Sequence, residues 1–496
     1  MNILPKPQKF ENISGNFSIT NNSKIFCAHE GFLPQAERLA DMVQSSSGNA
    51  LQFTDTLTDA QIIFSFDENY HPEGYTLMIS QGVATVVCST ATGCFYAVET
   101  LRQLFKLDGQ QDEISCANCY VEDFPAFAHR GLMVDISGYF FGLDTLKLVV
   151  ELMSQVKLNK LHLRLSDDQG FRLEIDKYPR LHQVASVRAG SQVLSGGQSV
   201  VDETPCGGYL TKEDARALVE YARSLGVEII PEISVPNHLV AVLAAYPEFS
   251  CTGQVAEVKK TWGQSKDILC AGNDASYDFI KDILDEICEI FTCNTVHLGA
   301  SKSHKDRWCN CKQCRERMAE LKIDDYDELQ THLVEVFRSY LASKGKTVVC
   351  YADGLTKNAS KDIVAQVSSS KRRAVAKQIK CGRRVIISHC KRINFSVDAK
   401  RTSFKKVAHM RPFRGVPKST RASVLGIEAT LFTHYIDTQD KLYYQLLPRL
   451  DALAEVAWSS GTNGIYKRVD QRLALYDKLQ LNYNKQIFRP KGNNNK

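Results

Sequence analysis

The sequence lacks any long hydrophobic run, and its 496 residues include only three Trp and seven Met. No apolar stretch reaches the roughly 18 residues that a membrane span needs, so we expect no contact with a membrane. Residues 1–7 contain no apolar core of a secretory signal, so we expect a cytoplasmic protein. The sixteen cysteines are scattered without a short framework, and we therefore expect reduced thiols.

Charge is unevenly distributed along a chain of ordinary globular composition, with 44% hydrophobic and 24% charged residues. Residues 371–421 contain 17 Lys or Arg against a single acid, Asp398, so this segment carries +16. Because the whole chain carries +5, the remainder carries −11. Such a basic segment can be a solvated face, or it can bind nucleic acid, a heparin-like polymer or an acidic surface.

The first 122 residues are predicted to form a small α+β domain. Residues 74–80 and 83–88 alternate between apolar and polar side chains, as the two strands of a hairpin do. Residues 92–105 have the spacing of an amphipathic helix that would cover such a sheet.

From about residue 128 the pattern changes to short apolar strands separated by amphipathic helices, which predicts βα units and a parallel sheet. The candidate strands are residues 131–136, 160–165, 228–233, 295–298, 347–351, 363–367, 384–388 and 424–431. Helical patterns at 143–156, 212–225, 277–291 and 326–343 lie between several of them. Eight strands are the count of a (β/α)₈ barrel, which we place at 123–475, followed by a C-terminal tail at 476–496.

Residues 295–308 begin as a buried strand and end in a polar loop, and His297, Leu298, Gly299 and Trp308 form a motif within them. This motif resembles the His-x-Gly-Gly-Asp-Glu sequence, with a Trp beyond it, of family 20 glycoside hydrolases, the β-N-acetylhexosaminidases. Further stretches resemble the first, second, third and eighth barrel strands of that family, in order: 130–135, 157–171, 208–238 and 426–431. The resemblance implies a small α+β domain before a (β/α)₈ barrel.

The resemblance also implies which positions would carry the chemistry, and most are substituted. Ser301 and Lys302 stand at the catalytic Asp and Glu of the family. Asp167 and His238, which support the acid in the family, are retained. The family's substrate-binding positions fall on Gly138, Arg164, Asp168, Tyr351, Ser368, Asn394, Ser396, Phe432 and His434.

The family's chemistry requires the two missing carboxyl groups. In these enzymes the 2-acetamido oxygen of the sugar attacks the anomeric carbon, while an acid protonates the leaving oxygen and a carboxylate orients the acetamido group. Ser301 cannot supply the negative charge, and a lysine with an ordinary pKa near 10.4 is a poor proton donor. Since general acid catalysis contributes roughly 10²- to 10⁴-fold, we expect ordinary hexosaminidase activity to be absent.

Two further candidate sites involve the same loop. Ser301 beside Lys302 could form a nucleophile pair, but adjacent side chains usually point apart and the Ser-x-x-Lys spacing is absent. Cys309, Cys311 and Cys314 with His304 are zinc-compatible ligands. Because no second cysteine pair follows in register, we expect free thiols here, with no metal or other cofactor bound.

The sequence therefore leaves three hypotheses open. The first is an inactive relative of the hexosaminidases that binds a carbohydrate or an anionic sugar-like ligand, because Arg164, Lys302, His304 and His434 would make the barrel mouth basic. The second is an enzyme that retains weak hydrolysis of terminal N-acetylhexosamine in a rewired site. The third is a polyanion-binding protein that uses the basic 371–421 segment.

Overall fold

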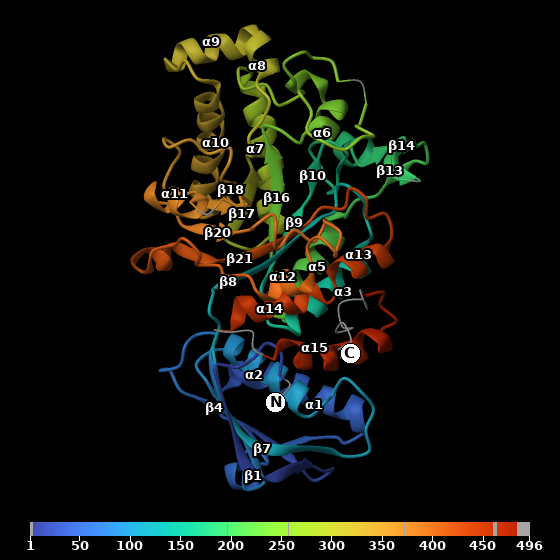
Figure 1. Cartoon of the computed structure of the whole chain (residues 1–496), viewed down its shortest axis with the longest axis vertical. Coiled ribbons are helices and arrows are strands. Elements are labelled where there is room, and N and C mark those ends of the chain that lie inside the picture. The colour runs from blue at the N-terminus through green and yellow to red at the C-terminus, as the bar shows by residue number, and fades with distance from the viewer. Residues whose placement is uncertain (1–2, 196, 256, 372, 460–463, 484–496) are drawn as a thin grey trace, which may run out of the picture.

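The computed structural model describes residues 3–195, 197–255, 257–371, 373–459 and 464–483 (Figure 1). The N-terminal part is a seven-stranded mixed sheet in the order β1-β7-β5-β6-β4-β2-β3. Its strands are β1 (Lys9–Ile19), β2 (Lys24–Cys27), β3 (Gln52–Phe53), β4 (Ile62–Phe66), β5 (Tyr75–Ser80), β6 (Val83–Cys88) and β7 (Ile114–Asp123). Helices α1 (Leu33–Ser47) and α2 (Ala91–Leu104) pack together beside this sheet (Figure 1). The predicted hairpin and the helix that follows it are β5, β6 and α2.

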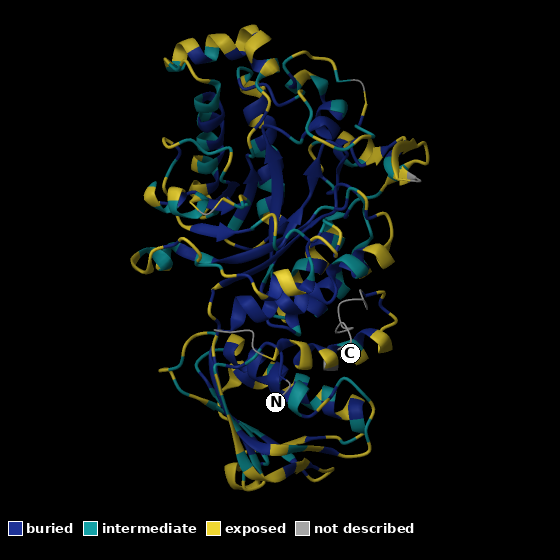
Figure 2. Cartoon of the chain, in the orientation of Figure 1, coloured by how far each residue is buried: buried dark blue, intermediate teal, exposed yellow. Residues whose placement is uncertain are grey.

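Eight parallel strands close the barrel that the sequence predicts, in the order β16-β17-β18-β19-β20-β21-β8-β9. They are β8 (His129–Asp135), β9 (Lys160–Arg164), β16 (Glu228–Val235), β17 (Thr295–Gly299), β18 (Thr347–Tyr351), β19 (Val364–Val367), β20 (Val385–Ile387) and β21 (Val424–Leu431). Nearly all of their residues are buried (Figure 2). This explains why these strands form continuous apolar runs in the sequence, as parallel strands covered on both faces do.

Helices surround the barrel on its outer side. They are α3 (Leu143–Ser154), α5 (Lys212–Ser224), α7 (Asp274–Ile290), α10 (Tyr326–Ser343), α11 (Ala374–Lys380), α12 (Phe404–Ala408), α13 (Gln439–Leu446) and α14 (Arg449–Trp458). Helix α7 shows the pattern that drives this packing, because Ile280, Ile283, Leu284 and Ile287 fall on one buried face. Among the described residues, no helix is both long enough and apolar enough to cross a membrane.

The loops at the C-terminal ends of the strands carry the smaller elements. They contain the two-stranded pairs β10 (Ser166–Asp167) with β11 (Gly170–Phe171), β12 (Val187–Arg188) with β15 (Cys206–Gly207), and β13 (Ser191–Ser195) with β14 (Gln198–Asp202). They also contain the short helices α4 (Arg180–Gln183), α6 (Val240–Ala245), α8 (Asp306–Asn310) and α9 (Lys312–Leu321). Helices α8 and α9 lie at the end of the molecule farthest from the N-terminal sheet (Figure 1).

A buried ion pair joins the N-terminal sheet to the barrel. Lys157 Nζ lies 2.8 Å from Asp123 Oδ2 at the end of β7, and both side chains are fully buried. Lys157 also donates to the Tyr75 hydroxyl, and the Trp458 indole donates to Asp123 Oδ1 over 2.8 Å. Because every charged atom here has a partner, the junction can be buried without an unpaired charge.

The predicted tail at 476–496 begins too early. Helix α15 (Ile465–Lys478) crosses the proposed boundary, and the fully buried Tyr476 donates a hydrogen bond of 2.6 Å to Asp451. The sequence analysis predicts no helix at residues 465–478, so its proposed boundary falls inside α15. Residues 484–496 lie outside the described residues.

Candidate functional site

A network of buried charged side chains fills the barrel below its mouth. His162 from β9 lies 2.8 Å from Glu232 and 2.9 Å from Glu428, while the His297 ring stacks on His162 with centroids 4.4 Å apart. The side-chain amide of Gln366 from β19 donates to Glu428, and its oxygen accepts a hydrogen bond of 3.0 Å from His297 Nε2. Although burial disfavours ionised carboxyl groups, the surrounding cations hold the pKa of Glu232 and of Glu428 well below the usual range.

Arg164 connects this network to the mouth. Its guanidinium lies 3.1 Å from Glu232 and 2.7 Å from Asp167, and Asp167 in turn lies 2.7 Å from His238 Nδ1. The structure therefore brings the two retained positions, Asp167 and His238, into direct contact. Burial works against a charged His238, but the Asp167 carboxylate outweighs it and raises the pKa of the ring. Burial beside Asp167 raises the pKa of Asp168 to about 6, although its carboxylate accepts backbone N–H groups from Val240 and Ser265.

Ser301 and Lys302 lie at the start of the loop that follows β17. Gly299 and Ala300 both have positive φ, +63° and +53°, and this turn directs the chain across the mouth. The Ser301 hydroxyl accepts a hydrogen bond of 3.0 Å from Asn237, the residue before His238. Lys302 is exposed, and its carbonyl accepts from Gln264. Ser301 is thus joined through Asn237 to the segment that carries His238.

Lys305, four residues beyond Ser301, was not singled out in the sequence. Its ammonium donates to the Ser303 hydroxyl and to Gln330, and it lies over the Trp308 ring. Burial, partly offset by Asp327, lowers the pKa of Lys305 to about 8. These contacts hold the loop in place, so Lys305 stabilises the conformation of the loop that contains Ser301 and Lys302.

Several predicted binding positions serve the protein's own backbone. A Cβ atom at Gly138 would lie 2.6 Å from the Thr433 hydroxyl, so the space for a larger side chain is closed. Asn394 accepts from the backbone of Ser396, whose hydroxyl accepts from the Phe432 N–H over 2.6 Å. The buried Tyr351 donates to Glu232 over 3.0 Å. Asn394 and Ser396 thus stabilise the backbone of their own loops, and Tyr351, at the end of β18, contacts the buried network.

Two predicted binding positions, Phe432 and His434, form an aromatic wall beside Arg164 together with Trp262, which was not predicted. Trp262, from the loop after β16, stacks on the His434 ring with centroids 4.8 Å apart, and His434 stacks on Phe432 at 5.9 Å. Tyr139 lies 6.0 Å from Trp262, and the Arg164 guanidinium lies over Phe432. Trp262 is one of only three Trp in the chain, which was the available signal, but its loop gave no indication of its position.

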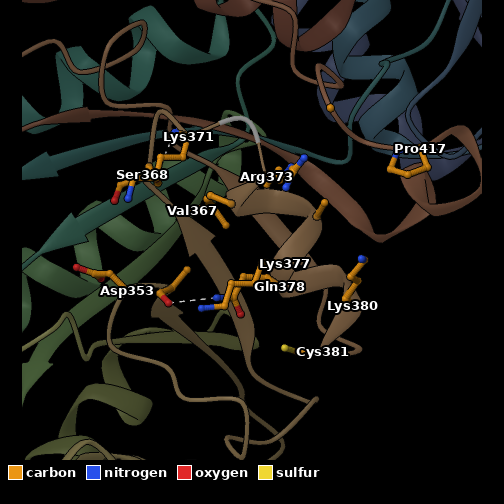
Figure 3. A pocket seen from close by; sticks show the side chains of 15 residues that line it. Asp353, Val367, Ser368, Lys371, Arg373, Lys377, Gln378, Lys380, Cys381 and Pro417 are labelled. Atoms are coloured by element: carbon orange, nitrogen blue, oxygen red, sulfur yellow. Dashed lines mark hydrogen bonds between the residues drawn. The ribbon is translucent and has the colours of Figure 1, made fainter.

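The basic segment 371–421 lines a cavity of about 970 Å³ at the ends of β18 and β19 (Figure 3). Lys371, Arg373, Lys377 and Lys380 line it, together with Ser368, which is the single predicted site residue in its lining. Not all of the segment is solvated, because the buried Arg383 donates to the carbonyls of residues 356, 359 and 360. Neither Asp167 nor His238 lines this cavity, so it is separate from the Asp167–His238 pair.

The predicted zinc-compatible set is only partly brought together. Cys311 and Cys314 lie beside Cys251 and Cys270, with the four sulfur atoms within 4.8 Å of one another. Cys309 is exposed and lies outside this group, and His304 is exposed beside Asp306. Cys251 and Cys270 were not among the candidates, because the sequence analysis considered only residues close to one another along the chain. Other groups are also compact enough to hold a metal ion, among them His162 with Glu232 and His297, and Asp167 with Asp168 and His238. In each of these two groups Arg164 already forms an ion pair with a carboxylate, Glu232 in the first and Asp167 in the second.

Comparison with known proteins gives consistent matches over most of the chain. The profile of the glycosyl hydrolase family 20 catalytic domain matches residues 127–461, and that of domain 2 of the same family matches residues 1–124. A beta-hexosaminidase of Porphyromonas gingivalis is 27% identical over 97% of this chain, which spans 64% of that protein's length. A beta-hexosaminidase of Akkermansia muciniphila is 29% identical over 85% of this chain and 86% of its own.

Solved structures share the fold. The exo-β-N-acetylglucosaminidase of Vibrio harveyi, solved with N-acetylglucosamine, has a TM-score of 0.87 and 24% identity, covering 98% of this chain and 78% of that one. The β-N-acetylhexosaminidase of Streptomyces coelicolor has a TM-score of 0.82 and 25% identity, covering 98% and 97%.

Proposed function

This chain belongs to glycosyl hydrolase family 20, and we propose that it is a β-hexosaminidase-type protein that binds a carbohydrate or an anionic sugar-like ligand at its barrel mouth without hydrolysing it by the family's usual chemistry. The observation that carries this proposal is a combination of two features. Ser301 and Lys302 stand at the positions that match the family's catalytic carboxyl groups, and the rest of the barrel mouth is well ordered. The Asp167–His238 pair is formed, and Trp262, His434 and Phe432 stack into the aromatic wall.

The aromatic wall supports carbohydrate binding. Sugar rings present apolar C–H faces as well as hydroxyl groups, and small-molecule sites combine aromatic side chains with a few placed polar groups. Trp262 and His434 are half-buried, so part of each ring is accessible, and Arg164, Asp167 and His238 supply polar atoms next to them.

Saturation-transfer NMR with N-acetylglucosamine tests this part of the proposal. We expect signal transfer to the wild-type protein and its loss in Trp262→Ala. Phe124→Ala, which removes an exposed aromatic ring at the end of the N-terminal sheet, is the matched control and should bind as the wild type does. Equal transfer to wild type and Trp262→Ala would refute the assignment of the wall as a binding surface.

The basic cavity supports an anionic ligand. Four cationic side chains, Lys371, Arg373, Lys377 and Lys380, line it beside the Ser368 hydroxyl and the Gln378 amide (Figure 3). A phosphorylated or carboxylated sugar carries the complementary charge. Calorimetric titration with a sugar phosphate should give heat that falls as salt is added, and no heat at low salt would count against this ligand class.

The names of the relatives favour a second candidate, hydrolysis of terminal N-acetylhexosamine. The Porphyromonas and Akkermansia proteins are named beta-hexosaminidases and align over most of this chain. In this alternative, the retained Asp167–His238 pair would support a proton donor other than the missing glutamic acid. Turnover of a fluorogenic N-acetylglucosaminide that disappears in Asp167→Asn and in His238→Gln would favour it over our proposal.

A further inference from the structure

Four cysteines from three separate segments meet beside the barrel mouth. Cys251 follows the turn after α6, Cys270 lies shortly before α7, and Cys311 and Cys314 occupy the N-cap and first turn of α9. The segments are far apart in sequence, since Cys314 is 63 residues from Cys251 and 44 from Cys270. Cys270, Cys311 and Cys314 are buried, and Cys251 is half-buried.

The sulfur atoms have the spacing of a tetrahedral metal site. Cys251 to Cys314 and Cys270 to Cys311 are each 3.8 Å between sulfur atoms, and Cys270 to Cys314 is 3.7 Å. Four ligands at about 2.3 Å from a central Zn²⁺ are about 3.8 Å apart along each edge of the tetrahedron. A disulfide would require about 2.05 Å. The distances therefore match coordination of a central ion and not direct bonding.

The surrounding backbone fixes this arrangement. Gly272 packs so closely on the backbone of Gln313 that a Cβ atom there would collide with it. The Trp308 indole donates to the Leu269 carbonyl over 2.9 Å, and the Cys270 N–H donates to Phe249 over 2.9 Å. The three segments are thus held together by contacts other than those of the sulfur atoms.

We propose that Cys251, Cys270, Cys311 and Cys314 bind one Zn²⁺ in a closed, structural site. Four soft thiolates in tetrahedral geometry are the ligand set that zinc prefers, and a closed site without an open position is structural rather than catalytic. The ion ties the loop after β16, which carries Asn237 and His238, to the loop after β17, which carries Ser301 and Lys302. The proposal does not depend on whether the barrel mouth hydrolyses or only binds a sugar.

Metal analysis of the full chain tests the proposal. Protein purified under reducing conditions from zinc-containing medium should hold one zinc per chain by mass spectrometry of the metal. Cys270→Ser and Cys314→Ser should lose it. Two controls should retain it: Cys309→Ser, an exposed thiol two residues from Cys311, and Cys293→Ser, a buried thiol outside the group. Removing zinc with a chelator should lower the melting temperature of the wild type but not that of Cys270→Ser.

A second measurement covers the case in which the serine variants fail to fold. Wild-type protein reconstituted with Co²⁺ should show thiolate-to-cobalt charge transfer and the intense d–d absorption of a tetrahedral site. Three results would overturn the proposal: wild type that neither holds nor takes up zinc after reduction, iron in place of zinc, or disulfides among these four cysteines in freshly purified protein. Zinc retained by Cys314→Ser at full stoichiometry would overturn it too.

Discussion

In the barrel interior, Glu232 and Glu428 each contact cationic or imidazole groups from neighbouring strands, and all of these side chains are buried. At the rim of the mouth, by contrast, Lys302 is exposed and the cations of the basic cavity line an open space. Replacing an interior charge leaves its partners buried without a counter-ion, whereas water can solvate the partners of a rim charge. Charged residues at the rim can therefore be substituted with little loss of stability, whereas those in the interior are needed for the stability of the fold.

The largest effect is expected from breaking the interior network at Glu428. Glu428→Leu would leave His129, His162 and the Gln366 amide without their acceptor. Removing one partner of a buried ion pair costs about 3–5 kcal/mol, so we expect a loss of that size in the free energy of unfolding. Urea denaturation followed by circular dichroism measures it. A loss below about 1 kcal/mol would mean that the interior charges do not differ from surface charges.

The pH dependence of stability should report His162 and His297 separately. Although burial opposes a charged ring, Glu428 and Glu232 raise the pKa of His162 to about 9, while burial beside His162 lowers the pKa of His297 to about 3. The His162 contribution is complete below its unfolded pKa of about 6.5 and is lost as pH rises to 9. As pH falls, His297 takes up a proton near pH 6.5 in the unfolded chain but only near pH 3 in the folded protein. Stability is therefore lost as pH falls from about 6.5 towards 3.

These two histidines therefore predict a maximum of stability near pH 6.5. Each limb should amount to roughly 1–3 kcal/mol, measured by urea denaturation across the pH range. In His162→Gln the alkaline limb should flatten relative to that of the wild type. An alkaline limb of equal slope in both proteins would show that His162 is not the group responsible.

At the basic cavity we expect an effect on binding without an effect on folding. The double variant Lys377→Ala/Lys380→Ala removes two of the four cations, so affinity for a sugar phosphate should fall severalfold at low salt and converge with the wild type at high salt. Lys441→Ala, an exposed lysine outside the cavity that pairs with Asp437, is the control. Unchanged affinity in the double variant would show that the cavity is not where the sugar phosphate binds.

The smallest effect is expected at the rim. Lys302→Ala changes an exposed side chain, and such substitutions usually alter the free energy of unfolding by no more than about 0.5 kcal/mol. Urea denaturation of Lys302→Ala and Glu428→Leu, each compared with the wild type, measures how much stability a rim residue and an interior residue contribute. A destabilisation by Lys302→Ala comparable with that of Glu428→Leu would break the comparison.

Much of the fold could be predicted from the sequence because its signals are local. The eight barrel strands are continuous apolar segments bounded by turn residues, and the structure confirms each of them. Asp167 and His238 were identified through the resemblance to family 20, and both follow such strands. Their contact with each other, and the closure of the space at Gly138 by Thr433, required three-dimensional information.

The rest of the site depends on long-range contacts that no local pattern reveals. Trp262 reaches His434 across the mouth from a loop 172 residues earlier in the chain. Cys251 and Cys270 join Cys311 and Cys314 although no fixed spacing relates the two pairs. Arg164 looks like a free basic residue of the mouth in the sequence, whereas in the structure it is buried between Glu232 and Asp167.

We propose that the mouth of this family 20 barrel binds a sugar but does not hydrolyse it, because Ser301 and Lys302 stand at the positions that match the carboxyl groups of the family. The most direct measurement is turnover of a fluorogenic N-acetylglucosaminide by purified wild type and by Lys302→Ala. We predict no release of fluorophore above background from either protein between pH 5 and 8. Clear turnover by the wild type that is lost in Lys302→Ala would contradict the claim and would make Lys302 the proton donor of a rebuilt site.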